Sequence, residues 1–299
     1  MSSNLIAITI KTFDRPDRLM STVRSIEQYC KEPYRLYIAD DGGHCPDLDA
    51  FYGGLQRQGH VIVRYPAWTS VTAARNDLVS RLADEPFVLR LDDDFNFVEE
   101  TNLGAMIAIM KSRPEIGALS GLERQFGMGK GTTSGEFSAK QGHIFLENGI
   151  LLRTNVPHQA WTYMTARGVR FAYANFTRNF LLIRRAVFDT VRWDEDLYIQ
   201  GEHLAFMLDL QRAGWLLAFT PESVHLHNEE GEDASNNYAI FRHSEEGINR
   251  RNAVFRNKFG IVSEGREVLV SPARVSPKKR WWRMHPVRAL LSKGFFMLA

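Results

Sequence analysis

The sequence predicts an α/β fold in which a mainly parallel sheet is flanked by helices. Short apolar and β-branched runs alternate with amphipathic segments over residues 4–121, and this alternation is typical of parallel strands joined by helices. Charged residues follow directly after several apolar runs, as in FVLRLDDDFNF (87–97). Because ligands of such sheets bind beyond the carboxyl ends of the strands, we expect a polar site at that edge.

Each expected element follows from the spacing of its apolar residues. Leu19, Val23 and Ile26 recur at helical spacing within 15–30, directly after the β-branched run 4–12. By the same reasoning we expect strands at 34–43, 60–65, 86–91 and 143–153, and helices at 71–83 and 201–215. Three segments combine elements: we expect a helix and a strand within 102–121, a strand and a short helix within 179–191, and a strand, a turn and a second strand within 216–228. The absence of a linker before about residue 270 predicts one main domain, 1–270, and a tail, 271–299.

Composition limits the classes of function. The chain has 299 residues, of which 44% are hydrophobic and 24% are charged, as in a globular protein of enzyme size. A net charge of +2 carries no electrostatic signal for nucleic acid, so no nucleic-acid partner is expected. Cys30 and Cys45 are too few for a disulfide framework, and no signal peptide precedes the first expected strand, which favours the cytoplasm. No run reaches the roughly 18 apolar residues of a membrane span.

Several aspartates lie at the expected ends of three strands: Asp14, Asp40, Asp41, Asp92, Asp93 and Asp94. Adjacent carboxylates repel one another, and burial raises the cost of each charge unless a cation compensates it. Aspartates are also common in surface turns, but convergence on one edge of a sheet favours a site for a positive group. Mg²⁺ and Mn²⁺ prefer oxygen ligands, and residues spaced as Asp92 and Asp94 project to one side of a strand.

Two histidines lie far downstream, in SVHLHN (223–228). His225 and His227 are separated by one residue and would face the same way on a strand. A pair of imidazoles without further context is as compatible with a packed or surface position as with a metal site.

In their order along the chain, several segments resemble the inverting glycosyltransferases of the GT-A fold, the large family-two-like group. The segments are TFDRPDRL, IADDGG, ARNDLV, LRLDDDF, WDEDLYIQGEHLAFMLDLQRAGW and FTPESVHLHN, which together cover about residues 4–228. Within that group, KTFDRPDRL, DDDF and EHLAFMLD look closest to the β-1,4-N-acetylgalactosaminyltransferases of ganglioside synthesis type. The resemblance implies a GT-A (Rossmann-like) catalytic domain with a nucleotide-binding half, 1–121, and an acceptor-binding half, 122–270.

The resemblance also implies a donor, a cofactor and roles for matching residues. The donor would be a nucleotide diphosphate sugar, UDP-linked, and the cofactor Mn²⁺ or Mg²⁺. The donor-binding residues would be Thr12, Asp14 and Arg15 around the nucleoside, Asp40 or Asp41 at the base, Arg75 at the diphosphate, and Asp92 or Asp93 at the ribose. Asp94 and His227 would hold the metal, whereas His225 would be structural.

The catalytic base is where this chain departs from the family. Relatives carry Glu-Asp at the start of a helix, and this chain carries Glu202-His203. In an inverting transfer a base removes the proton of the attacking acceptor hydroxyl. The helix dipole lowers the pKa of Glu202, and a histidine such as His203 has the better unperturbed pKa near neutrality. We favour Glu202 and keep His203 as the alternative.

The segment WDEDL just before this helix resembles the acceptor side of the family. It implies that Trp193 stacks on a sugar ring and that Asp194 bonds its hydroxyls. A core tryptophan beside a surface acid would give the same sequence.

Three segments have few apolar anchors or an unusual composition. The segment 124–142 is rich in Gly, Ser, Thr and Lys without a phosphate-binding spacing, so we expect a loop. The acidic segment 229–238 is either a surface loop or a segment that closes over the donor. The tail 276–299 mixes basic residues with tryptophans, which suits an amphipathic helical extension at an anionic membrane surface. Such a tail would make the protein peripheral on the inner face of the membrane, with a lipid-linked glycan as acceptor; packing on the domain or a dimer contact is the alternative.

Other functions explain parts of the pattern. A nucleotidyltransferase on a related fold would keep the aspartates but needs a glycine-rich, basic first loop, which TFDRPDRL does not provide. A non-catalytic glycan- or nucleotide-binding subunit is compatible with the Glu-His departure. A zinc hydrolase would lack the HExxH spacing.

Overall fold

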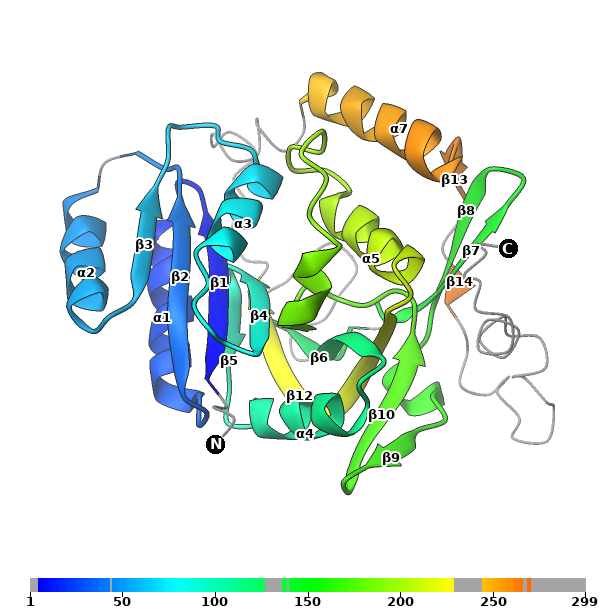
Figure 1. The fold of residues 1–299 in the computed structure, drawn as a ribbon, viewed down its shortest axis with the longest axis horizontal. Helices are drawn as coiled ribbons and strands as arrows, with labels where there is room; N and C mark the ends of the chain where they lie inside the picture. Colours follow the sequence, from blue (N-terminus) through cyan, green and yellow to red (C-terminus); the bar gives the residue numbers. More distant parts are fainter. Residues whose placement is uncertain are drawn as a thin grey trace.

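A computed structural model of the protein describes residues 5–43, 45–126, 136–138, 140–228, 244–265 and 268–269. Its centre is a large mixed sheet whose strands follow the order β3-β2-β1-β4-β11-β6-β12-β10-β9. Helices pack on both faces of this sheet (Figure 1). The predicted α/β fold is therefore confirmed.

The first half of the sheet is parallel. Its strands are β1 (Ile6–Thr12), β2 (Tyr34–Asp40), β3 (Val61–Arg64) and β4 (Phe87–Asp92), and each neighbouring pair among them runs in the same direction. The helices α1 (Pro16–Tyr29), α2 (Pro46–Arg57) and α3 (Val71–Ser80) connect them. The carboxyl ends of β1, β2 and β4 consequently meet at one edge.

The second half of the sheet is mixed rather than parallel. The strand β11 (Leu181–Arg184) is antiparallel to both β4 and β6 (Ile116–Phe126). The long strand β12 (Leu216–Asn228) is parallel to β6. The strand β10 (Val169–Ala174) is antiparallel to β12, and β9 (Met164–Ala166) is antiparallel to β10. A three-residue strand, β5 (Phe95–Phe97), leaves the main order and pairs with the end of β12.

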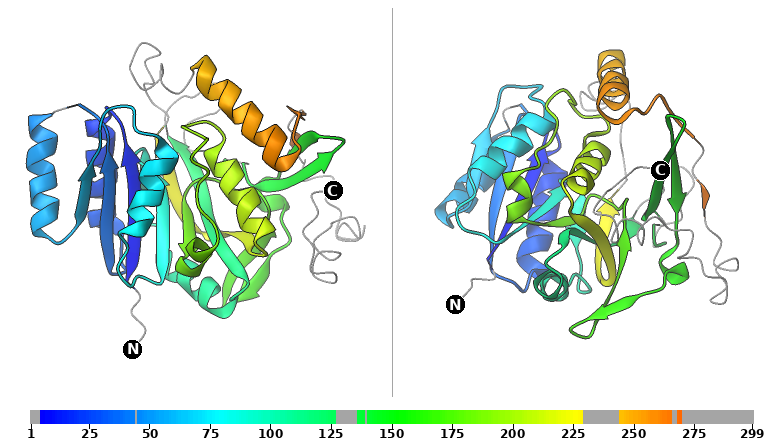
Figure 2. Two further views of the ribbon diagram at one scale, coloured as in Figure 1. Left: turned by 45° about the horizontal axis from the view of Figure 1, so that its top comes forward. Right: turned by 45° about the vertical axis from the view of Figure 1, so that its right-hand side comes forward.

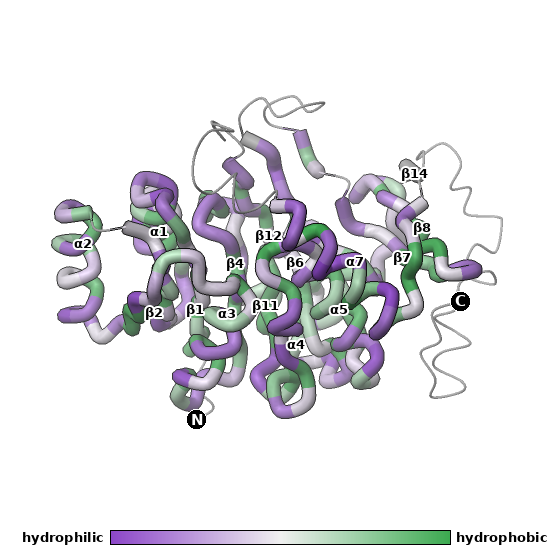
Figure 3. The backbone as a smooth tube through the Cα atoms, turned by 90° about the horizontal axis from the view of Figure 1, so that it is seen from above, coloured by the Kyte–Doolittle hydropathy of each residue, from purple (hydrophilic) through white to green (hydrophobic). Residues whose placement is uncertain are grey.

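The hydrophobic core lies in two layers, one on each face of the sheet. One layer holds buried residues of α1, α2 and α4 (Leu103–Ser112), and the other holds those of α3, α5 (Glu202–Arg212) and α7 (Glu245–Phe259). Figure 2 shows α3 and α5 on the same side of the sheet. Hydrophobic stretches run through the central strands β11 and β12 (Figure 3), so the sheet is buried between helices.

A smaller sheet lies beside the main one. Its hairpin consists of β7 (Gly142–Glu147) and β8 (Ile150–Asn155), and the short strands β13 (Ser263–Glu264) and β14 (Val268–Leu269) run parallel to β8. The single strand expected at 143–153 is thus a hairpin. Its turn is Asn148–Gly149, and both residues have positive φ, as an Asn-Gly turn requires.

Two further expectations need correction. The helix α2 was not expected, because Gly53 and Gly54 weaken its helical pattern, although Pro46 at its first turn is a start signal. Residues 216–228 form one strand with a register shift between Phe219 and Val224, not two strands around a turn. Pro221 lies within this irregular stretch, where a missing N–H costs no ladder hydrogen bond.

Parts of the predictions lie outside the described residues. They are the center of the loop expected at 124–142, the acidic segment 229–238 and the tail 276–299. Within the described residues, no helix is both long enough and apolar enough to cross a bilayer. The division at residue 270 stays a prediction.

The junction between the two sheets depends on Gly142. Its N–H donates to the carbonyl of Phe176 (2.9 Å), and a Cβ at this position would lie 1.5 Å from the carbonyl oxygen of Thr154. We expect Gly142→Ala to lower the free energy of unfolding by about 1–3 kcal/mol, because the backbone of β8 must move. Urea denaturation measures this loss.

Gly53→Ala is the matched control for this prediction. Its Cβ would meet nothing closer than the Arg57 guanidinium at 3.5 Å, and alanine suits a helix interior. The control should be neutral or slightly stabilising, and an equal loss in both variants would contradict the steric explanation.

Candidate functional site

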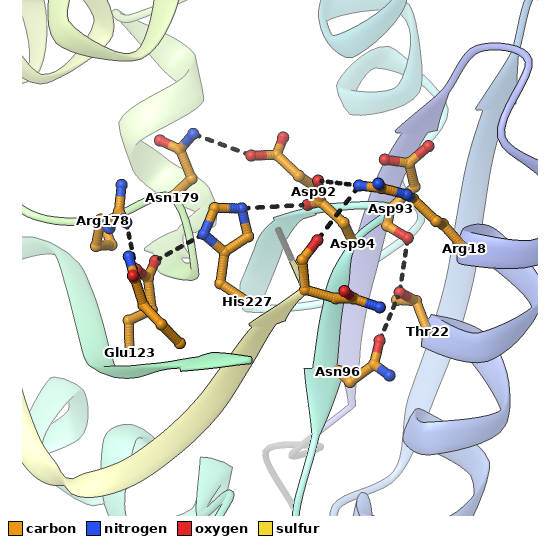
Figure 4. Close-up of polar contacts among 12 residues, drawn as sticks. Arg18, Thr22, Asp92, Asp93, Asp94, Asn96, Glu123, Arg178, Asn179 and His227 are labelled. Atoms are coloured by element: carbon orange, nitrogen blue, oxygen red, sulfur yellow. Dashed lines mark hydrogen bonds and ion pairs between the residues drawn. The ribbon is translucent and has the colours of Figure 1, made fainter. Parts of the chain in front are cut away.

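The three aspartates at the end of β4 lie at the carboxyl edge of the sheet, close to residues from both halves of the chain (Figure 4). Asp92 is the last residue of β4, whereas Asp93 and Asp94 form the turn into β5. The pairing of β5 with β12 places His227 opposite Phe95, and Asn228 donates its N–H to the carbonyl of Asp94 (2.9 Å). The short strand β5 therefore brings His227 to the aspartates.

Asp92 is held by cationic and amide groups. Its carboxylate accepts hydrogen bonds from Arg90 (2.7 Å), Arg75 (3.1 Å) and Asn179 (3.0 Å). Burial opposes its ionisation, but Arg90, Arg75 and the Asn179 amide outweigh burial and hold the pKa of Asp92 well below its usual range. The side chain is 26% exposed, so Asp92 keeps some access to a ligand.

Asp93 is fully buried and bonded inside the protein. It accepts a hydrogen bond from the Thr12 hydroxyl (2.6 Å) and pairs with the Arg15 guanidinium. Burial raises the pKa of Asp93 to about 6, although Arg15 acts in the opposite direction. Of the two residues predicted at the ribose, Asp92 is the one whose side chain is exposed to a ligand.

Asp94 uses its two oxygens differently. Oδ2 lies 3.1 Å from Arg15 and 3.5 Å from Arg18. Oδ1 is buried, has no hydrogen-bond partner among the described residues, and lies 3.9 Å from Nε2 of His227. β4 ends at Asp92, so the strand period does not extend to Asp94. The two carboxylates contact different arginines, and their projection to one side stays a prediction.

A single divalent ion fits between Asp94 and His227. Their facing atoms are 3.9 Å apart, less than twice a metal–oxygen bond of about 2.1 Å, so one ion can contact both. The described part of the chain contains no group of three or more His, Cys, Asp or Glu residues that could hold a metal. A Mg²⁺ or Mn²⁺ ion here would take its remaining ligands from phosphate oxygens and water.

Glu123 and Arg178 belong to the same cluster but were not predicted. Glu123 of β6 is fully buried, pairs with Arg178 and faces Nδ1 of His227 at 3.7 Å. Burial opposes its charge, but Arg178 and His227 hold the pKa of Glu123 well below its usual range. The sequence GLERQF gives no signal for this role, because a charge within a strand is normally read as exposed.

His225 is structural, as predicted from the resemblance. It is fully buried, and its ring stacks on Phe180 at a centroid distance of 4.3 Å. Burial lowers the pKa of His225 to about 3. It therefore stays neutral at physiological pH.

Arg75 of α3 connects the aspartates to the predicted base. Its guanidinium lies 3.1 Å from both Asp92 and Glu202, and the side chain is buried. Glu202 is the first residue of α5, and its Oε1 also lies 3.5 Å from Nδ1 of His203. Burial opposes the charge of Glu202, but His203, Arg75 and Arg90 outweigh it and lower the pKa to about 2.

The two candidate bases, Glu202 and His203, differ in their burial. Oε2 of Glu202 is buried and has no hydrogen-bond partner in the part of the chain that the structure describes, whereas the His203 side chain is 38% exposed. A carboxylate with a pKa of about 2 is a weak base. Glu202 therefore needs a change in its surroundings to accept a proton near neutrality.

The residues expected around the nucleoside divide into buried and exposed groups. Asp40 and Asp41 are buried: Asp40 accepts from the Tyr52 hydroxyl (2.9 Å), and Asp41 pairs with Lys11. Asp14 is exposed and has a φ of +50°, and the Gly43 N–H donates to its carboxylate (2.8 Å). Of these three acids, Asp14 has the access that a nucleoside requires.

Trp68 is a second exposed residue at this edge and was not predicted. It is 42% exposed, has a φ of +67°, and its ring lies 5.0 Å from that of Phe13. A bulky residue at positive φ is uncommon and often marks a functional site. The sequence signal for this residue is a tryptophan in the short segment AWTS, between the expected strand 60–65 and the expected helix 71–83.

The expected acceptor residues have other contacts. Trp193 is only 3% exposed, and its ring stacks on Phe206 at 4.6 Å, so little of its surface is exposed to a sugar. Asp194 pairs with Lys258 of α7 (2.7 Å). Both residues support the position of α7 and α5, and acceptor binding by either remains a prediction.

The sheet order and the acidic edge define the class of fold, which is the GT-A fold of glycosyltransferases. The crystal structure of GalNAc-T7 with UDP, GalNAc and Mn²⁺ is similar with a TM-score of 0.66 and 17% identity, over 85% of this chain and 49% of that chain. The structure of S. aureus TarS 1-349 is similar with a TM-score of 0.52 and 13% identity, over 85% of this chain and 73% of that chain. This chain thus spans about half of the GalNAc-T7 chain, and no protein-family profile matches it.

The lowered pKa of Glu202 predicts a pH-dependent stability. A carboxylate whose folded pKa of about 2 lies below its ordinary value of 4.5 stabilises the fold fully above pH 4.5 and loses this contribution as pH falls toward 2. We expect Glu202→Gln to lower the free energy of unfolding by about 2–3 kcal/mol at pH 7. Urea denaturation at several pH values should show the difference from wild type shrinking below pH 4.5, and a constant difference would contradict the assignment.

Proposed function

We propose that this protein is a metal-dependent glycosyltransferase that moves a sugar from a nucleotide diphosphate sugar to a saccharide acceptor. The observation that carries this proposal is the pair Asp94 and His227, whose facing atoms are 3.9 Å apart at the carboxyl edge of a GT-A sheet. Arg15, Arg18 and Arg75 surround the acids. This combination suits a diphosphate and a divalent cation together.

The residues of this site divide the binding of the donor between them. Asp14 would contact the nucleoside, and the buried Thr12 would support this edge through its hydrogen bond to Asp93. Asp92 would bond the ribose, and Asp94 and His227 would hold the metal. Bound Mn²⁺ or Mg²⁺ would neutralise the charge that develops on the diphosphate. Arg75 and Arg15 contribute positive charge from the protein side. We infer a UDP-linked donor, which is supported by the nucleotide in the GalNAc-T7 structure.

We propose an inverting transfer with Glu202 as the base. The acceptor hydroxyl attacks the anomeric carbon opposite the leaving nucleotide, and Glu202 accepts its proton. In the free protein His203, Arg75 at 3.1 Å and Arg90 together outweigh burial and lower the pKa of Glu202 to about 2. When the diphosphate shares the charge of Arg75, the burial of Glu202 raises its pKa and makes it a better base. Donor binding would thus precede proton transfer.

A hexose or N-acetylhexosamine is the proposed sugar, and a glycan or lipid-linked glycan is the proposed acceptor. The basic, aromatic composition of 276–299 supports a membrane surface on the cytoplasmic side. The narrower resemblance to the ganglioside-type enzymes remains a prediction.

Thermal shift with UDP, GDP and dTDP sugars, each with Mn²⁺ or with a chelator, tests the proposal. At about 100 times the dissociation constant, a bound donor should raise the Tm by roughly 5–10 °C, and the rise should require the metal. In the same assay Asp94→Asn should lose the metal-dependent part of the shift, because it removes one of two protein ligands.

The alternatives give different results in that assay. A nucleotidyltransferase would respond to nucleoside triphosphates instead, and a binding subunit would bind the donor without hydrolysing or transferring its sugar. No shift with any nucleotide diphosphate sugar would refute the transferase.

Replacing the candidate bases separates their roles. Glu202→Gln should leave metal-dependent donor binding nearly unchanged and lower kcat by about 10²- to 10⁴-fold, because the proton acceptor is lost. His203→Asn is the paired control and should retain most of the turnover. Near-normal kcat in Glu202→Gln together with a large loss in His203→Asn would assign the proton to His203 instead.

A further inference from the structure

His227 lies between two buried carboxylates that come from different strands (Figure 4). Its Nδ1 is 3.7 Å from Oε2 of Glu123, and its Nε2 is 3.9 Å from Oδ1 of Asp94. These two carboxylate oxygens are both buried and accept no hydrogen bond within the described chain. The imidazole therefore presents one nitrogen to each acid.

Glu123 is placed to act on His227 and on nothing outside the protein. Its side chain has no exposed surface, whereas that of His227 is 18% exposed, so His227 is the member of the pair that a ligand can reach. Its Oε1 is bound by Arg178 and by the Gln125 amide (3.4 Å), whereas its Oε2 faces two imidazoles, His227 at 3.7 Å and the buried His225 at 4.0 Å. The ring of Phe95 packs edge-on against His227 at 4.8 Å and limits its rotation.

We propose that Glu123 is the positioning residue of the metal site. It attracts the N–H of His227 to Nδ1 and so leaves the lone pair of Nε2 facing Asp94. Metal-binding histidines commonly donate their other N–H to a carboxylate, which orients the ring and raises its basicity as a ligand. This inference rests on the proposed function, because it assumes that Nε2 binds the metal.

One short segment aligns both sides of the site. Arg178 pairs with Glu123, and the next residue, Asn179, donates to Asp92 (3.0 Å). The segment between β10 and β11 thereby contacts Glu123 on the metal side and Asp92 on the ribose side. Glu123 itself faces His227 and not Asp92, so a change in Glu123 should affect metal binding more than nucleoside binding.

The test measures Mn²⁺ binding in the presence of saturating UDP, with the free ion detected by electron paramagnetic resonance. Glu123→Gln should weaken Mn²⁺ binding about 10- to 100-fold, while the affinity for UDP with a chelator stays as in wild type. Pulsed resonance should show the ¹⁴N modulation of a coordinated imidazole in wild type and a reduced modulation in the variant. Neither readout depends on turnover.

Two further variants keep the test decisive. Glu85→Gln is the matched control, because Glu85 is equally buried and is bonded to the Tyr37 hydroxyl (2.7 Å) instead of a histidine; its Mn²⁺ affinity should not change. Glu123→Asp retains the charge beside Arg178 but draws the carboxylate back from Nδ1, so it should give an intermediate loss. This variant decides the question if Glu123→Gln does not fold.

The outcomes separate this inference from the proposed function. Unchanged Mn²⁺ affinity and unchanged ¹⁴N modulation in the Glu123 variants would overturn the positioning role while leaving the transferase intact. An equal loss in Glu85→Gln would also overturn it, because the effect would then be general destabilisation. Wild-type protein that binds no Mn²⁺ with UDP would refute the proposed function itself.

Discussion

The compensation of buried carboxylates by arginines is the constraint on which the rest of the site depends. Asp92, Asp93 and Asp94 follow one another at the end of β4, and ionised groups are costly to bury without partners. Each receives at least one guanidinium within 3.1 Å, from Arg75 and Arg90 or from Arg15. The arginines come from the segment after β1, from α3 and from β4 itself, so the edge forms only when these elements are packed.

Two of the carboxylate oxygens at this edge are left without a hydrogen bond. Among the described residues, five buried carboxylate oxygens have no hydrogen-bond partner, and they include Oδ1 of Asp94 and Oε2 of Glu202, whose other oxygens lie beside Arg15 and Arg75. Unsatisfied buried oxygens are uncommon in native proteins and require an explanation. A cation at Asp94 and a substrate proton at Glu202 explain these two, which is why the two positions carry the proposed metal and base.

Local patterns predicted much of the fold and part of the site. The strands β1 to β4 were predictable because β-branched runs and strand-end acids are local signals, as in FVLRLDDDF. The antiparallel insertion of β11 was not, since four residues such as LLIR pair equally well in either direction. The pairing of Asp94 with His227 was anticipated through the resemblance, but Glu123 was missed because its burial depends on β12 lying beside β6.

The sequence by itself determined which residues are acidic at the strand ends, where the helices α1 and α3 begin, and that histidines return near residue 228. Only the tertiary structure decided which of these groups are exposed. It buried Asp93, Asp41 and Trp193 and left Asp14 and Trp68 at the surface. The physical reason is that spacing along a chain sets the direction of a side chain within one element, whereas exposure and pKa depend on the elements that pack over it.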